Sequence, residues 1–193
     1  KMKIKTGWQI KYLNLDYREY LVGNETTRLI SNPNIISTFF SSTWQLFPTL
    51  YINPGIRFSK YNRYNENIIN PRFAIKYNPI SNLALKLSWG KFSQFLYTIN
   101  REDELLRIVD FWQPVPNNKK PQEAHHYIIG AEYWISEGNI ISIESYYKPY
   151  SVLYDLNPKA SNQDLDNTFA ISGTGTAIGI EFLYRLMIDK ISG

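Results

Sequence analysis

Two histidines, His125 and His126, are the only ones in the chain, and they are neighbours. In a strand their side chains point to opposite faces, so they cannot bind one metal ion together. Cysteine is absent, which excludes thiolate zinc sites and thiol catalysis. The stretch NQDLDN offers oxygen atoms of Asp164, Asp166 and Asn167 to calcium, but it lacks the glycine and distal glutamate of an EF-hand. A solvated acidic loop is the favoured interpretation, and we expect no metal and no cofactor.

A serine–histidine–acid set can be assembled on paper from Ser93, His126 and Glu144. No nucleophile elbow surrounds the serine, and any chain of this size contains such a set. We therefore expect that the protein is not an enzyme.

Three glutamates would project to the same side of three consecutive strands, with Lys148 and Arg185 nearby; they are Glu132, Glu144 and Glu181. They form either a structural ion-pair network, which is the favoured interpretation, or a ligand contact. The stretch NREDELLRIVDFW is the one helical candidate, and Trp112 at its end is either a ligand contact or, as we favour, a packing anchor. The candidate ligand-binding residues are Trp112, His126, Glu132, Glu144, Glu181 and Arg185.

These residues lie on or between segments in which apolar and polar residues alternate. In NIISIESYYKPY, residues 139–150, Ile141 and Ile143 occupy one face of a strand, and Glu144 and Lys148 occupy the other. Pro54 should give its strand an irregular start. Further alternating segments cover 2–21, with a change of frame at 12–13, and 34–47, 50–61, 70–78, 83–95, 124–135 and 174–187.

The connections between these segments alternate in length. Residues 48–49, 79–82 and 136–139 are short, whereas 22–33, 62–69, 96–123 and 157–172 are longer. If the strands run up and down, all short turns lie at one end and all long loops at the other. This asymmetry is typical of outer-membrane barrels.

The two faces support the same interpretation. Leucine and isoleucine occupy the middle of the apolar face and aromatic residues its ends, as a lipid-facing band would. The polar face mixes charges with glycines, which suits a wet or plugged interior. A soluble barrel of lipocalin type has the same period with the opposite polarity. The net charge of +4 is scattered, so nucleic acid is not an expected partner.

The stretches LYINPGIRFSKYN, INPRFAIKYNP, LALKLSWGKFSQF, KPQEAHHYIIGAEYWI and GTGTAIGIEFLYR occur in an order that resembles the barrels of TonB-dependent outer-membrane receptors. The resemblance covers about residues 50–187. It implies a barrel of about 22 strands, filled by a plug domain, that takes up a scarce ligand with energy delivered by TonB.

We therefore expect an all-β fold: an antiparallel up-and-down transmembrane β-barrel, here a segment of about eight strands that forms an open curved sheet. Residues 1–193 would be part of the barrel domain of a larger receptor in the outer membrane of a Gram-negative bacterium. The expected partners are membrane lipid, the receptor's own plug domain, the TonB complex and a small-molecule, glycan or peptide ligand. The alternatives are a passive porin or channel, and a small structural or adhesive barrel of eight strands.

Overall fold

The computed structural model of the protein describes residues 1–21, 24–99, 111–156 and 170–186. Eight strands form one antiparallel sheet in the order β1, β4, β5, β6, β7, β10, β11, β12, and β2–β3 and β8–β9 form two small hairpins. The predicted all-β antiparallel fold is thus confirmed. The strand bounds are β1 Met2–Tyr12, β2 Leu15–Leu21, β3 Asn24–Ser31, β4 Asn34–Phe47, β5 Leu50–Tyr61, β6 Ile68–Ile80, β7 Leu83–Gln94, β8 Leu96–Ile99, β9 Phe111–Pro114, β10 Gln122–Ser136, β11 Asn139–Leu156 and β12 Ala170–Arg185.

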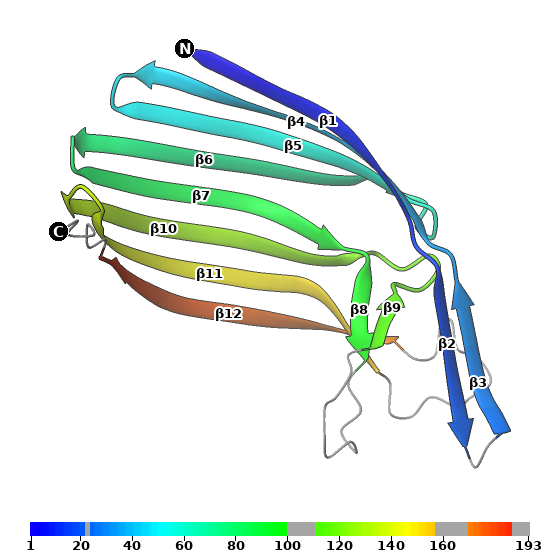
Figure 1. Cartoon of the computed structure of the whole chain (residues 1–193). Coiled ribbons are helices and arrows are strands. Elements are labelled where there is room, and N and C mark those ends of the chain that lie inside the picture. The colour runs from blue at the N-terminus through cyan, green and yellow to red at the C-terminus, as the bar shows by residue number, and fades with distance from the viewer. Residues whose placement is uncertain (22–23, 100–110, 157–169, 187–193) are drawn as a thin grey trace, which may run out of the picture.

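The main sheet is strongly curved and open (Figure 1). β1 and β12 are its two edges, and no ladder joins them. The prediction of an open curved sheet is therefore confirmed, and the described residues do not form a closed barrel of eight strands. None of the described residues forms a helix that could cross a membrane.

Connections are sorted by length between the two ends of the sheet, as the sequence predicted. The tight turns of β4–β5, β6–β7 and β10–β11 lie together at one end, whereas both small hairpins stand at the other (Figure 1). Two expectations were wrong in detail. Residues 24–31 of the expected loop 22–33 form β3, which pairs with β2, and the expected loop 96–123 contains β8 and β9. Most of the helical candidate and residues 157–169 lie outside the described residues.

Pro54 lies inside β5 and not at an irregular start, which corrects the sequence-based expectation. Proline has no N–H to donate to a ladder. The β4–β5 ladder accordingly skips from Ser41–Gly55 to Trp44–Ile52 with its register unchanged. The other neighbour, β6, pairs with β5 through Phe73 opposite Pro54.

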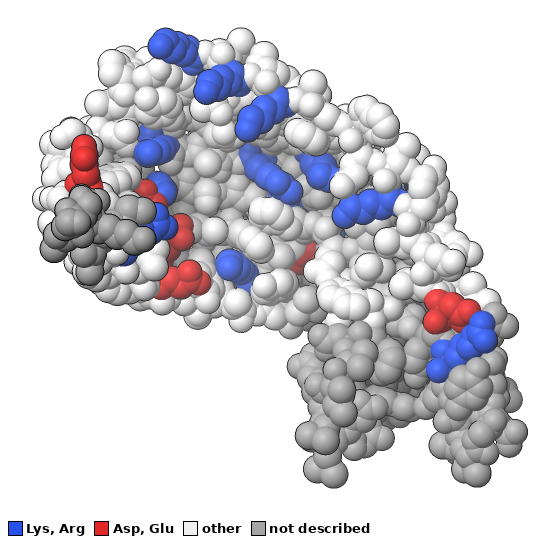
Figure 2. Space-filling view, viewed as in Figure 1, with Lys and Arg blue, Asp and Glu red and all other residues white. Residues whose placement is uncertain are grey.

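Curvature decides which face of the sheet is inside. The hollow face carries Lys, Arg, Asp and Glu (Figure 2). Large apolar side chains are exposed on the convex face, which is opposite to the polarity of a lipocalin. Those in the middle of the strands include Phe40, Leu85, Leu87, Ile143 and Ile180, which are 41–74% exposed.

Glycines on the hollow face give room to large residues directly opposite them on the next strand. Gly130 is paired with Glu144, and a Cβ at Gly130 would lie 2.7 Å from Cγ of that glutamate. Gly179 is paired with Tyr146, whose hydroxyl would be 2.5 Å from such an atom. On the hollow face, the space above each of these glycines is therefore filled by the large side chain of the residue paired with it.

A small hydrophobic core closes the end that carries the hairpins. Ile35, Tyr61 and Ile68 project from the hollow side of β4–β6, and Tyr97 and Val115 of the long connection bury them. We call these five residues the rim core. The Tyr61 hydroxyl donates a hydrogen bond of 2.9 Å to the Val115 carbonyl, and Tyr61 and Val115 are fully buried. The rim core thus holds the segment after β9 inward, over the hollow face.

We expect Tyr61→Phe to loosen this segment, because the buried Val115 carbonyl then lacks its donor, at a cost of about 1–3 kcal/mol. The amide of Val115, which donates to the Phe95 carbonyl, should exchange its hydrogen faster by a factor of about five or more. Tyr51→Phe is the control, because the Tyr51 hydroxyl accepts from Gln45 elsewhere on the hollow face. Unchanged exchange at Val115 in Tyr61→Phe would refute this role of the hydroxyl.

Candidate functional site

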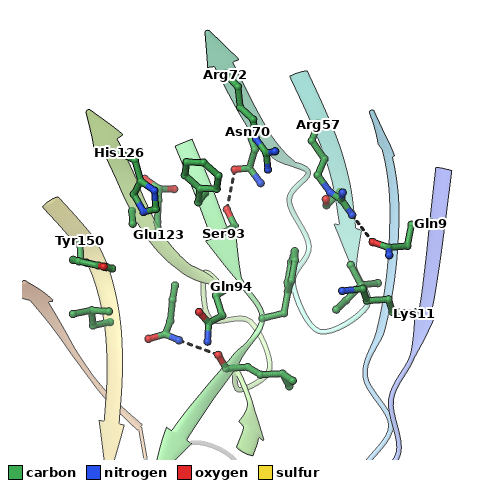
Figure 3. Close-up of a pocket in the computed structure, with 18 of the residues that line it drawn as sticks. Gln9, Lys11, Arg57, Asn70, Arg72, Ser93, Gln94, Glu123, His126 and Tyr150 are labelled. Atoms are coloured by element: carbon green, nitrogen blue, oxygen red, sulfur yellow. Dashed lines mark hydrogen bonds between the residues drawn. The ribbon is translucent and has the colours of Figure 1, made fainter. Parts of the chain in front are cut away.

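A cavity of about 640 Å³ opens on the hollow face beside the rim core. We call it the mouth cavity. Strands β1, β5, β6, β7, β10 and β11 all contribute to its lining (Figure 3). Its polar and charged lining residues include Gln9, Lys11, Arg57, Asn70, Arg72, Ser93, Gln122, Glu123, His126 and Tyr150.

Two arginines project into the mouth cavity from adjacent strands. Arg57 of β5 lies opposite Asn70 of β6, and Arg72 lies two residues further along β6. Arg57 Nη2 donates a hydrogen bond of 2.7 Å to Oε1 of Gln9, which fixes one end of its guanidinium (Figure 3). Neither arginine forms an ion pair with a described carboxylate. Arg57 and Arg72 are therefore diagonal neighbours on adjacent strands, and their like charges repel each other.

Arg72 is held in place by an aromatic stack. Its guanidinium carbon lies 4.7 Å from the centroid of the Phe92 ring. The same ring stacks on His126, with centroids 4.3 Å apart. Gly90 lies opposite both Arg72 and His126, so no side chain between them blocks the contact. A guanidinium that contacts a ring face through its π-system can still donate hydrogen bonds through its N–H groups.

The carboxylate at the cavity, Glu123, is already neutralised. Its Oε2 lies 2.8 Å from Nζ of Lys91 and 2.8 Å from Nζ of Lys120. The Ser151 hydroxyl donates to Oε1 at 3.2 Å. Only 8% of the glutamate side chain is exposed. The two lysines therefore neutralise its negative charge, which does not offset the positive charge of Arg57 and Arg72.

Of the six predicted ligand-binding residues, the structure brings Trp112 and His126 to the mouth cavity. Trp112 is 48% exposed, so it is not the packing anchor that we favoured from the sequence. The anchors of the long connection are Tyr97 and Val115. His125 lies on the opposite side of β10 from His126 and stacks on Trp89, so the two histidines do not meet.

The four other predicted residues lie away from the mouth cavity. Glu132 forms an ion pair with Lys86, and Glu144 lines a second cavity of about 450 Å³. Glu181 lies directly opposite Glu144, and Arg185 lies near the end of β12, opposite Ile140. The three glutamates do share the hollow face, but they do not converge on one point with His126.

The serine–histidine–acid set of Ser93, His126 and Glu144 does not assemble either. The Ser93 hydroxyl donates to Oδ1 of Asn70 at 3.0 Å, and Glu144 belongs to the second cavity. Among the described residues, no three His, Asp or Glu side chains are grouped to hold a metal ion. The calcium candidate, with Asp164, Asp166 and Asn167, lies outside the described residues.

The chain matches no protein-family model and no curated protein sequence. Its fold is similar to that of the siderophore receptor PirA from Pseudomonas aeruginosa, with a TM-score of 0.63 at 11% identity, over 94% of this chain and 39% of that one. A variant of the ferric enterobactin receptor PfeA from the same organism, in complex with enterobactin, gives 0.64 at 14% identity, over 94% and 30%.

Barrel receptors of the outer membrane therefore share the fold of this chain. The similarity confirms, at the level of the fold, the resemblance seen in the sequence. The chain spans 30% of the length of PfeA and 39% of that of PirA.

Sequence reasoning missed Lys11 and the convergence of Arg57 with Arg72. The alternation of polar and apolar residues places Arg57 and Arg72 on the polar face of their strands, but it does not show which residues of neighbouring strands lie opposite each other. Counting residues outward from each short turn comes closest to predicting the register of the paired strands. The register obtained in this way is wrong by one residue, because β4–β5, β6–β7 and β10–β11 each have a register shift beside the turn.

We expect Glu123→Gln to lower the free energy of unfolding of the full-length protein by about 1–3 kcal/mol, because Lys91 and Lys120 then face each other without their carboxylate. Urea unfolding in detergent micelles measures this difference. Glu137→Gln is the control, since Glu137 is exposed in the turn between β10 and β11 and should change stability by less than about 0.5 kcal/mol. Equal effects of both variants would contradict a stabilising role of the cluster.

Proposed function

We propose that residues 1–193 are part of the barrel wall of a larger receptor. This receptor lies in the outer membrane of a Gram-negative bacterium, binds a ligand at its outer face and takes it up with energy delivered by TonB. The observation that supports this best is the polarity of the sheet. Apolar side chains cover the convex face, and charges line the hollow face. Lipid outside and a wet interior require this arrangement.

The open edges support a wall segment within a larger barrel. β1 and β12 each leave one side without a partner strand in the described sheet. In a bilayer an unpaired strand edge is not tolerated, because every backbone N–H and C=O must be satisfied internally. Further strands of the receptor would complete both edges. The plug domain and the segment that contacts TonB would likewise belong to other parts of the receptor.

Orientation follows from the sorted connections. The end with the small hairpins and the mouth cavity would face the outside of the cell, and the end with the short turns would face the periplasm. A small-molecule, glycan or peptide ligand would then enter at the mouth cavity. This role needs no catalytic step by the chain.

We expect Ile143→Arg to cost about 2–4 kcal/mol in folding of the full-length receptor into liposomes, because Ile143 lies in the middle of the convex face. Ser142→Arg is the matched control, since Ser142 is the adjacent residue and points to the hollow side. Its cost should be small. Equal or reversed costs would overturn the assignment of the convex face to lipid.

The transport mechanism is tested by conductance across a planar bilayer, together with binding of the periplasmic domain of TonB. A plugged receptor should conduct almost no ions and should bind TonB. A large, steady conductance without TonB binding would refute the proposal and favour a passive porin.

A further inference from the structure

Charge on the hollow face is divided between the two halves of the sheet. On β1 and β4–β7 of the main sheet, every charged residue whose register places it on the hollow face is a lysine or arginine: Lys3, Lys5, Lys11, Arg57, Arg72, Lys76 and Lys86. The hollow face of β10–β12 carries Glu132, Glu144 and Glu181 as well as Lys148 and Arg185. Figure 2 shows basic side chains spread over the upper part of the hollow face.

Three of these cations, Lys11, Arg57 and Arg72, line the mouth cavity. Within the described part of the chain, no carboxylate lies within ion-pair distance of any of them. Glu123, which also lines the cavity, is paired with Lys91 and Lys120. The mouth cavity therefore has an excess of positive charge that the described residues do not neutralise.

The two arginines are arranged to receive oxygen atoms. Gln9 holds Arg57, and the Phe92–His126 stack supports Arg72, so little side-chain freedom remains to be lost on binding. Each guanidinium presents a planar set of donors that matches an oxyanion in two-point contacts. Asn70 lies opposite Arg57 and two residues before Arg72 on β6; it is 3% exposed, and its Oδ1 accepts from Ser93 (Figure 3).

We propose that the mouth cavity binds a small polyanion with at least two oxyanion groups, carboxylate or phosphate, one at Arg57 and one at Arg72. Lys11 adds a third positive charge at the β1 side. A cavity of about 640 Å³ has the size of a small-molecule site. This inference deepens the proposed function, on which it rests, by naming the chemical class of the ligand.

The test uses the full-length protein in detergent micelles and isothermal titration calorimetry with citrate, inorganic pyrophosphate and neutral sucrose. We expect at least one of the two anions to bind and sucrose not to bind. Arg57→Gln and Arg72→Gln should each weaken anion binding about tenfold or more. Arg72→Lys should weaken it less than Arg72→Gln, because the charge remains while the planar donor set is lost.

Lys76→Gln is the matched control. Lys76 lies four residues along β6 from Arg72, on the same hollow face, and it lines the second cavity. It should change anion affinity by less than about twofold, since charge at that distance is screened by salt. Circular dichroism of each variant confirms that the barrel is folded.

Absence of binding by both anions would overturn the inference, and so would binding of sucrose as tight as that of the anions. Equal losses in Lys76→Gln and Arg72→Gln would also overturn it, because they would indicate a general field and not a site. The titration requires neither TonB nor transport. If the protein conducts ions as a porin but binds anions through its arginines, the proposed function is refuted and the anion site is retained. If it is coupled to TonB but binds neither anion, the anion site is refuted and the proposed function is retained.

Discussion

The antiparallel backbone ladder is the constraint on which the rest of the structure depends. Because side chains alternate along each strand, the ladder assigns every residue to the hollow or the convex face. A slip of one residue in any strand would exchange the two faces of that strand. Bulges beside the short turns prevent such a slip. The shift between Gln45 and Phe47, for example, allows Phe47 to pair with Leu50 at the turn while Arg57 stays opposite Phe39 on the hollow face.

The same ladder explains how charged residues can be placed without carboxylate partners. Arg57, Arg72 and Lys76 project from β5 and β6 into a hollow open to water, where an unpaired cation costs little. In a dry core each of them would cost several kcal/mol. The glycines contribute to this arrangement. Gly90 leaves space beside Arg72, and Gly130 leaves space for Glu144, so long side chains lie across the sheet instead of crowding its centre.

The sequence was sufficient to predict the eight strands of the main sheet and their faces, and it was insufficient to predict the small hairpins and the mouth cavity. Alternation placed the strands at 34–47 and 50–61 with the bounds that the structure shows, because a half-buried strand requires that pattern. The convergence of Arg57, Arg72 and His126 depends on three strand registers. Turn length alone does not fix these registers, since each short turn has a bulge beside it and residues 62–67 and 95–121 connect other strands. His126 was singled out for its residue type, but register sets its stacking partner Phe92, whose ring also contacts Arg72.

The rim core joins residues that are far apart along the chain. Tyr61 and Val115, linked by a hydrogen bond, are separated by 54 positions, and the strands β6, β7, β8 and β9 lie between them. Closing so long a loop loses chain entropy before any contact compensates for it. The local hairpins β4–β5 and β6–β7 need only short closures, so we expect them to form first. We then expect the mouth cavity to be among the last parts of this sheet to assemble, and a chain arrested during folding to contain its hairpins before this cavity.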